Sequence, residues 1–249
     1  MTLLKEVQEH LTALTLCHAA RSLEKILEKA QTEDWTILKT LNTLLSEERN
    51  ARSDKARDKR LKQAGFPYMA TIGEFDFGFQ TSISKKQMYQ LLELTWLESA
   101  FNIMFLGPPS VGKTHLAVSL GMAAVNAGYK VIFIHMDQLI HALKTQEISP
   151  KSKSKLKRLY QADLVIIDEV GFQPVNRNEA NLLFCVINQL YQQTSIILTS
   201  NKGLSEWGEF MGDPVITAAM LDRLMHKCEI FAMEGDSYRL SHRERILKD

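Results

Sequence analysis

The sequence predicts an α/β fold, in which a parallel sheet lies between helices, preceded by a small all-α N-terminal domain. From about residue 102 onward, short apolar segments alternate with helical patterns, which is typical of parallel strands that are buried on both faces. Before residue 64, apolar residues recur only at helical spacing. A chain of 249 residues is long enough for one α/β domain and a small appendage.

Composition excludes several classes of protein. Hydrophobic residues make up 45% and charged residues 24% of the chain, which is ordinary for a folded protein and argues against disorder, collagen or a disulfide scaffold. Cys17, Cys185 and Cys228 lack metal-ligand spacing, so we expect reduced packing residues. The charged pair Lys5 and Glu6 precedes any signal-like apolar run, and no segment reaches membrane-spanning length. We therefore expect a cytoplasmic protein without a membrane partner.

Residues 1–64 are predicted to form the helical N-terminal domain. Its last helix is expected to continue through a basic segment and to stop at the Gly-Phe-Pro sequence at 65–67, because glycine favours the left-handed C′ position and proline cannot extend a helix. This stop is the predicted boundary with a second domain, residues 65–249. The apolar positions at helical spacing are Leu3, Val7, Leu11, Leu14, Leu23, Ile26, Leu27, Ile37, Leu38, Leu41, Leu44 and Leu45.

The second domain is predicted to begin with an extended segment at 71–80 and a helix at 86–97. Alternating patterns then predict five strands, at 102–106, 130–135, 164–167, 195–199 and 228–233. The helices predicted between them cover 114–126, 137–144, 179–191 and 215–225. In parallel sheets of this kind, ligands bind beyond the carboxyl ends of the strands.

The strongest motif is Gly-Pro-Pro-Ser-Val-Gly-Lys-Thr at 107–114, which follows a predicted strand and opens a helix. This context is what a P-loop requires, because its backbone amides and the helix N-terminus hold the phosphates of ATP. Lys113 is expected to reach the β- and γ-phosphates, and the Thr114 hydroxyl to ligate Mg²⁺. The alternative is a glycine-rich turn that binds nothing. The predicted nucleotide-binding residues are Gly107, Pro108, Pro109, Ser110, Val111, Gly112, Lys113, Thr114 and His115.

Asp168 and Glu169 follow the apolar strand at 164–167. In company with a P-loop, the first acid is expected to hold Mg²⁺ through water and the second to activate the attacking water. A GTPase switch or a kinase would not require this glutamate. The alternative is an Asp-Glu pair that only caps the next helix.

Asn201 follows the strand at 195–199 and opens an Asn-Lys-Gly-Leu sequence. That sequence is similar to the guanine-binding Asn-Lys-x-Asp of GTPases, but Leu204 replaces the carboxylate that would bind guanine. We therefore expect Asn201 to lie beside Asp168 and to orient the lytic water. A plain turn-forming asparagine is the alternative.

Basic residues are unevenly distributed, although a net charge of +1 gives no bulk attraction for nucleic acid. Seven bases accompany four acids between Glu47 and Lys62, and a second run, at 151–158, contains no acid. Each run is either a solvated surface or a contact for the DNA backbone. The residues predicted to bind DNA are Lys151, Lys153, Lys155, Lys157, Arg158, Arg49, Arg52, Arg57 and Arg60.

Several longer motifs occur in the second domain: Gly-Lys-Thr-His-Leu-Ala from Gly112, Thr-Ser-Asn from Thr199, Ser-Glu-Trp from Ser205, Asp-Arg-Leu from Asp222 and Gly-Asp-Ser-Tyr-Arg from Gly235. Together they resemble the IstB family, ATPase helpers of bacterial insertion-sequence transposition. The resemblance covers the chain from about residue 75 onward and, more loosely, the helical N-terminus. This family belongs to the AAA+ ATPases and is similar to the helicase loader DnaC.

The resemblance implies a nucleotide held between neighbouring subunits of a ring or helical assembly. Asn201 then matches the first sensor, Arg223 the arginine finger that acts in the next subunit, and Arg239 the second sensor. From the residues alone, Arg223 could instead pair with Asp222 or another nearby acid. The catalytic residues implied are Glu169, Asp168, Lys113, Asn201, Arg223 and Arg239.

Three features depart from the family pattern. Ser110 stands where glycine is common, which is acceptable if its backbone angles are ordinary. Leu190-Tyr191 replaces a frequent Arg-Tyr pair, which puts any intersubunit role of that arginine in doubt. The helical lid of many AAA+ proteins has no counterpart after Arg239.

Two functions follow from these observations. The first is an ATPase that assembles on duplex DNA, without sequence preference, and helps a transposase select or use its target. The alternative is a DnaC-like helicase loader that acts on single strands. A third candidate, a remodelling ATPase that binds only proteins, would be favoured if no DNA stimulated hydrolysis.

Overall fold

The computed structural model describes residues 2–243, and its contacts divide the chain into two compact units, one up to Lys59 and one from Arg60. The division falls within helix α3 (Ile37–Ala64), which ends where the sequence predicted. Gly65 follows α3 with a φ of 73°, the left-handed conformation expected of a C′ glycine.

The first unit contains helices α1 (Leu3–Ala13), α2 (Cys17–Thr32) and most of α3. Buried Glu48 links α3 to α2, because its Oε2 accepts the amide N–H of His18 and of Ala19, each at 2.8 Å. The bond from Ala19 above all lowers the pKa of Glu48, and the bond from His18 lowers it further. Arg52 donates to the same carboxylate at 2.6 Å and to the carbonyl of Thr15, so its guanidinium stabilises this helix pair.

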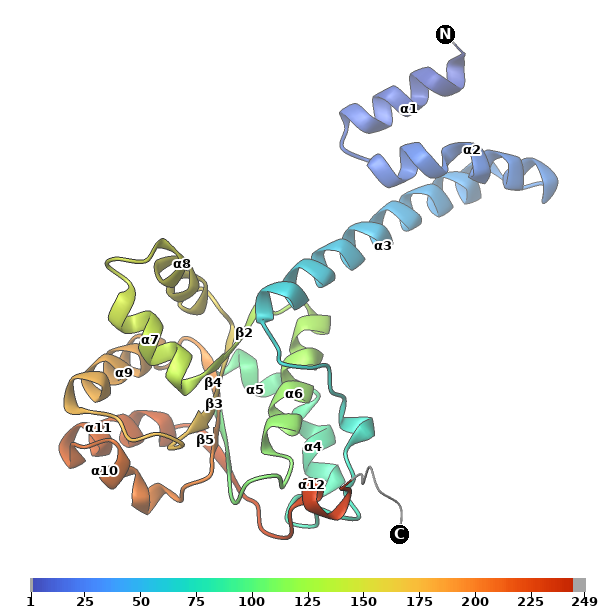
Figure 1. Ribbon diagram of the computed structural model, residues 1–249. Coiled ribbons are helices and arrows are strands. Elements are labelled where there is room, and N and C mark those ends of the chain that lie inside the picture. Colours follow the sequence, from blue (N-terminus) through green and yellow to red (C-terminus); the bar gives the residue numbers. More distant parts are fainter. Residues whose placement is uncertain (1, 244–249) are drawn as a thin grey trace. The chain divides into compact units, whose positions relative to one another are not determined.

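The second unit contains a parallel sheet with the strand order β2-β3-β4-β1-β5, as the alternating sequence pattern predicted (Figure 1). Consecutive positions of each strand face opposite sides, so both faces are apolar and both must be covered. The strands are β1 (Asn102–Leu106), β2 (Val131–His135), β3 (Leu164–Val170), β4 (Ser195–Ser200) and β5 (Cys228–Ala232).

Helices cover both faces of the sheet, and each face has its own hydrophobic core (Figure 1). One face lies against α4 (Lys85–Leu91), α5 (Thr95–Glu98) and α6 (Lys113–Ala127). The other lies against α7 (Met136–Thr145), α8 (Pro150–Leu159), α9 (Arg177–Leu190), α10 (Trp207–Phe210) and α11 (Pro214–Met225). The remaining elements are the 3-10 turns η1 (Ile72–Glu74) and η2 (Leu204–Glu206) and the short helix α12 (Tyr238–Ser241).

Three predicted elements differ from the structure, and one segment forms a helix that was not predicted. The helix expected at 86–97 is broken into α4 and α5 because Leu94 takes a left-handed φ of 60°. Strand β3 continues to Val170, so the two acids lie within the strand and not after it. The segment at 71–80 contains the turn η1, which Glu74 closes by accepting the Thr71 amide at 2.8 Å. The lysine-rich stretch forms α8, with a proline in its first turn.

No helix that the structure describes is both long enough and apolar enough to span a lipid bilayer.

Candidate functional site

The P-loop runs from the end of β1 to Gly112, the N-cap of α6, and its backbone requires glycine at both ends. Gly107 has a φ of 151°, and a Cβ at this position would lie 2.0 Å from the carbonyl oxygen of Met233. Gly112 has a φ of 97°, and a Cβ there would lie 2.5 Å from the ring of Phe75. These contacts show that packing, as well as phosphate chemistry, restricts both positions.

The condition under which serine was acceptable at position 110 is not met, because Ser110 has a left-handed φ of 66°. This left-handed conformation costs a residue with a Cβ roughly 1–2 kcal/mol. The Ser110 carbonyl accepts the amide N–H of Tyr238 at 3.0 Å, so α12 is tied to the centre of the loop. The strain therefore accompanies a contact between the P-loop and the C-terminal segment.

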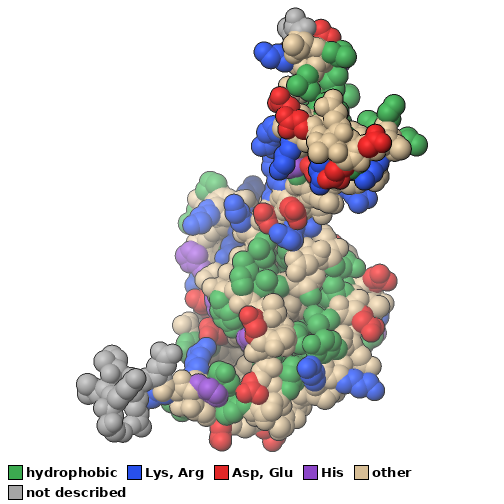
Figure 2. Space-filling view, turned by 90° about the vertical axis from the view of Figure 1, so that its right-hand side faces the viewer, with side chains coloured by type: hydrophobic (Ala, Val, Ile, Leu, Met, Phe, Trp, Pro, Cys, Tyr) green, Lys and Arg blue, Asp and Glu red, His purple; other side chains and the backbone are tan. Residues whose placement is uncertain are grey.

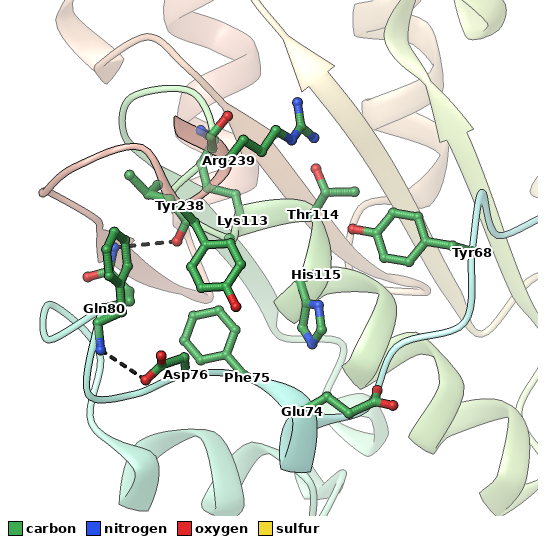
Figure 3. Close-up of a pocket in the computed structure, with 14 residues that line it drawn as sticks. Tyr68, Glu74, Phe75, Asp76, Gln80, Lys113, Thr114, His115, Tyr238 and Arg239 are labelled. Carbon is green, nitrogen blue, oxygen red and sulfur yellow. Dashed lines mark hydrogen bonds between the residues drawn. The ribbon is translucent and has the colours of Figure 1, made fainter. Parts of the chain in front are cut away.

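A cavity of about 310 Å³ opens beside the P-loop, which is within the size range of small-molecule sites. The rings of Tyr68, Phe75 and Tyr238 lie around Lys113 and Thr114 in Figure 3. The aromatic lining was not predicted from the sequence, although Phe75, in the Phe-Asp-Phe sequence at 75–77, was a signal for it. The polar lining residues are Glu74, Asp76, Gln80, Ser110, Lys113, Thr114, His115 and Arg239.

Lys113 lies between the loop carbonyls and the acids of β3. Its Nζ donates to the carbonyls of Gly107 at 2.7 Å and Pro108 at 2.6 Å. Burial lowers its pKa to about 8; the charge of Asp168 opposes this shift and that of Arg239 adds to it. A partly desolvated ammonium in this position is suited to a phosphate ligand.

Asp168 is 1% exposed and joins α6 to β4. Its Oδ1 accepts the hydroxyls of Thr114 at 2.9 Å and Thr199 at 2.5 Å. Thr199 also accepts the amide N–H of Glu169 at 3.0 Å, so one hydroxyl holds both acids. Thr199 belongs to the Thr-Ser-Asn motif, but the sequence did not predict that its hydroxyl would contact both acids.

Glu169 lies at a bulge between β3 and β4, where the register shifts between Ile167 and Val170. Its φ is 63°, and its side chain is exposed. Left-handed backbone in a residue other than glycine is concentrated at functional sites. The bulge directs Glu169 away from the buried side of the strand.

His135, at the end of β2, faces both acids and was not predicted from the sequence. Its Nδ1 lies 3.5 Å from Asp168 Oδ2 and 3.6 Å from Glu169 Oε2. This buried nitrogen makes no hydrogen bond to the residues that the structure describes. One ligand atom from each of the three residues lies within 4.8 Å of the others. Together with the Thr114 hydroxyl, the carboxylate oxygens suit a hard divalent cation such as Mg²⁺.

Residues 9–246 match the family described as IstB-like ATP binding protein. The chain belongs to this family. The insertion sequence IS21 ATP-binding protein of Pseudomonas aeruginosa is 40% identical over 96% of this chain and 91% of its own length. The insertion sequence IS5376 ATP-binding protein of Geobacillus stearothermophilus is 38% identical over 98% of this chain and 97% of its own.

Among solved structures, the DnaC helicase loader resembles this IstB-like protein with a TM-score of 0.51. It is 20% identical and covers 59% of this chain and 86% of its own. At this identity the likeness shows the fold alone, which is the AAA+ P-loop fold that the family resemblance implied.

The two further arginines of this IstB-like protein lie in different surroundings. Arg239 lines the P-loop cavity of its own chain (Figure 3). Arg223, on α11, does not line it. Its Nε donates to Asn188 Oδ1 at 2.9 Å, and its guanidinium lies 4.8 Å from the centre of the Phe184 ring. Within residues 2–243, Arg223 forms no ion pair, so the alternative pairing with Asp222 is not observed.

Asn201 follows β4, and β4 pairs with β3, so this residue is next to the strand of Asp168 as expected. Its side chain is exposed. No contact that the structure records within its described residues links Asn201 to either acid, so the sensor role stays a prediction.

The basic residues predicted to bind DNA fall into two groups. In the first unit, Arg52 is bound by Glu48, and Arg57 lies 3.7 Å from Asp54 and 3.5 Å from Asp58. Arg49 is exposed there. The second unit holds Arg60 and the basic residues of α8, of which the exposed ones are Lys151, Lys153, Lys157 and Arg158. Lys155 is half-buried and donates to Gln138 at 3.0 Å.

Proposed function

We propose that this IstB-like protein is a Mg²⁺-dependent ATPase of the cytoplasm that assembles on duplex DNA with ATP and helps a transposase select or use target DNA. The observation that supports the ATPase most directly is the hydrogen-bonded set Thr114, Asp168 and Thr199 beside Lys113. Lys113 and Thr114 line the cavity beside the P-loop, and the Thr114 hydroxyl donates to the buried carboxylate of Asp168.

Each group in the cavity has a role in this proposal. The P-loop amides and Lys113 bind the triphosphate, and the rings of Tyr68, Phe75 and Tyr238 offer apolar surface to the base. Thr114 and Asp168 would hold Mg²⁺, which supplies neutralising charge to the phosphate oxygens. Glu169 accepts a proton from the attacking water, and Asn201 orients that water.

Arg223 is proposed to act on the nucleotide of a neighbouring subunit, and Arg239 on that of its own. The support for this division is that Arg239 lines the cavity whereas Arg223 contacts Asn188 and Phe184 and forms no ion pair with the residues that the structure describes. A cation supplied only by a neighbour makes hydrolysis depend on assembly, and such fingers contribute roughly 10³–10⁵ in rate.

The decisive experiment compares the full chain with Glu169→Gln and Lys113→Ala in ATP-dependent sizing, with and without duplex DNA. Glu169→Gln should bind ATP and assemble as the parent does, with hydrolysis reduced about 100-fold or more, because only proton transfer is lost. Lys113→Ala should lose nucleotide binding and assembly together. Equal calorimetric uptake of ATP by Lys113→Ala and the parent would overturn the proposal.

Transposition is favoured over helicase loading because the relatives that match nearly the whole chain are insertion-sequence ATP-binding proteins. This proposal expects tighter binding to duplex than to single-stranded DNA, and hydrolysis that changes when the transposase of the same element is added. Preference for single strands and capture of a hexameric helicase would support the DnaC-like alternative instead. Hydrolysis that responds to no DNA would favour a protein remodeller.

A further inference from the structure

A second depression, of about 180 Å³, lies at the end of the sheet opposite the P-loop. The P-loop follows the carboxyl end of β1, whereas this depression adjoins Lys130, the residue before β2 begins. Three separate segments supply its polar lining: Arg60 and Gln63 from the end of α3, Lys130, and Arg158 and Gln161 from the end of α8. All three segments belong to the second unit.

The lining is cationic. It contains three bases and two neutral amides, and no acid. Two acids lie two residues away from the lining along the chain. Asp163 accepts the backbone N–H of Lys130 at 2.7 Å, and Asp58 lies 3.5 Å from Arg57. Arg60 donates through Nε to the carbonyl of Val125 at 3.4 Å. Across residues 2–243, none of the three bases forms an ion pair.

The helix α8 adds more positive charge next to the depression. It carries no acid, and Figure 2 shows Lys and Arg side chains gathered at the upper end of the larger unit. Burial lowers the pKa of Lys155, and the charges of Arg158 and Lys151 lower it further, whereas the charge of Asp137 opposes this shift. Because like charges at short range repel each other, a bound polyanion would relieve this repulsion.

Two bases of the first unit's basic run differ in this respect. Arg52 and Arg57 are matched there by Glu48, Asp54 and Asp58. Sequence reasoning assigned both runs the same two interpretations, a solvated surface or a contact for DNA. The structure separates them, and it joins Arg60, from the end of the first run, to Arg158, from the end of the second.

We propose that Arg60, Lys130 and Arg158 bind a backbone phosphate of duplex DNA, with the exposed lysines of α8 extending the contact along the strand. Guanidinium groups match phosphate oxygens with paired N–H donors, and glutamine amides commonly donate to the same oxygens. A depression of about 180 Å³ accommodates a phosphate group, and a contact to phosphate carries no sequence information. This inference rests on the proposed DNA-binding function and names the surface that performs it.

The test measures binding of a fluorescein-labelled duplex by anisotropy over a series of salt concentrations, using the full chain. The double variant Arg60→Gln with Arg158→Gln removes two charges and keeps polar side chains. Its affinity should fall about tenfold or more at moderate salt, and the slope of log affinity against log salt should shrink by about one, because these residues bind one phosphate. Arg177→Gln is the matched control, since exposed Arg177 is already paired with Asp213 at 3.0 Å, and it should bind DNA as the parent does.

Gln161→Glu provides a second variant that leaves both arginines and Arg60's contact with Val125 in place. It adds an acid to the depression and should also weaken duplex binding, while ATP binding by every variant stays at the parental level. Parental DNA affinity and salt slope in the double variant and in Gln161→Glu would overturn this inference and leave the proposed function intact. A parent that binds no duplex would overturn both.

Inorganic phosphate, exchanged for chloride at equal ionic strength, separates DNA from free anions as the ligand. It should displace the duplex no more than chloride does. Strong displacement that disappears in the double variant would identify a site for free phosphate and overturn the inference.

Discussion

Thr199→Val should uncouple the two acids of the ATP site while preserving side-chain shape. Thr199 is 1% exposed and donates to Asp168, which is equally buried, and it accepts the amide of Glu169. Valine replaces the hydroxyl by a methyl group. The substitution therefore removes one hydrogen bond to a charged group and leaves one amide without its partner.

The magnitude follows from these two losses. A hydrogen bond to a charged group contributes about 1.5–3 kcal/mol and a neutral one about 1 kcal/mol, and the added methyl group returns part of this. We expect Thr199→Val to lower the free energy of unfolding by roughly 2–3 kcal/mol. Because Asp168 and Glu169 lose their common support, ATP hydrolysis should fall by roughly 10- to 100-fold.

Urea unfolding of the full chain can follow the fluorescence of Trp96 and Trp207, with Trp35→Phe as background to remove the signal of the first unit. Thr199→Ser is the matched control, since it keeps the hydroxyl and should retain most of the activity and lose no more than about 1 kcal/mol. Thr199→Val that unfolds and hydrolyses ATP like the parent would show that this hydroxyl supports neither acid.

Three further predictions concern the P-loop. Because burial holds the pKa of Lys113 at about 8 and phosphates bind its protonated form, ATP affinity should fall roughly eightfold from about pH 7.5 to about pH 9, and Lys113→Arg should abolish this dependence in calorimetric titrations. Gly107→Ala places a Cβ 2.0 Å from the Met233 carbonyl and should lower the free energy of unfolding by ~3 kcal/mol or more in urea titrations, whereas a stable variant would contradict the backbone described here. Ser110→Gly relieves a left-handed φ and should raise that free energy by about 1 kcal/mol in thermal melts, and an unchanged melting temperature would contradict strain at this position.

The strands and the P-loop could be predicted from the sequence because their signals are local. A run such as 164–167 is apolar at every position, and only a strand covered on both faces buries such a run at this length. Elements that depend on distant packing were harder to predict. Leu94 has no helix-breaking chemistry, yet its left-handed φ divides α4 from α5.

The sequence by itself predicted that Gly107, Lys113 and Asp168 lie close together, since a parallel sheet brings the carboxyl ends of its strands to one edge. Only the tertiary structure decided which other groups meet there. His135 and Thr199 reach the acids through strand register, and Tyr238 reaches the P-loop through a backbone hydrogen bond. Strand pairing and helix packing set such contacts between distant segments, and no local pattern encodes them.

Contacts between distant segments also decide how the basic residues are grouped. Both basic runs contain a dense series of bases in the sequence, but a charge acts according to what lies within a few ångströms of it. The acids that pair with Arg52 and Arg57 lie within four residues of them, so helical spacing alone accounts for these ion pairs. Only the fold brings Arg158 to the same depression as Arg60 and Lys130, because these bases come from three separate segments.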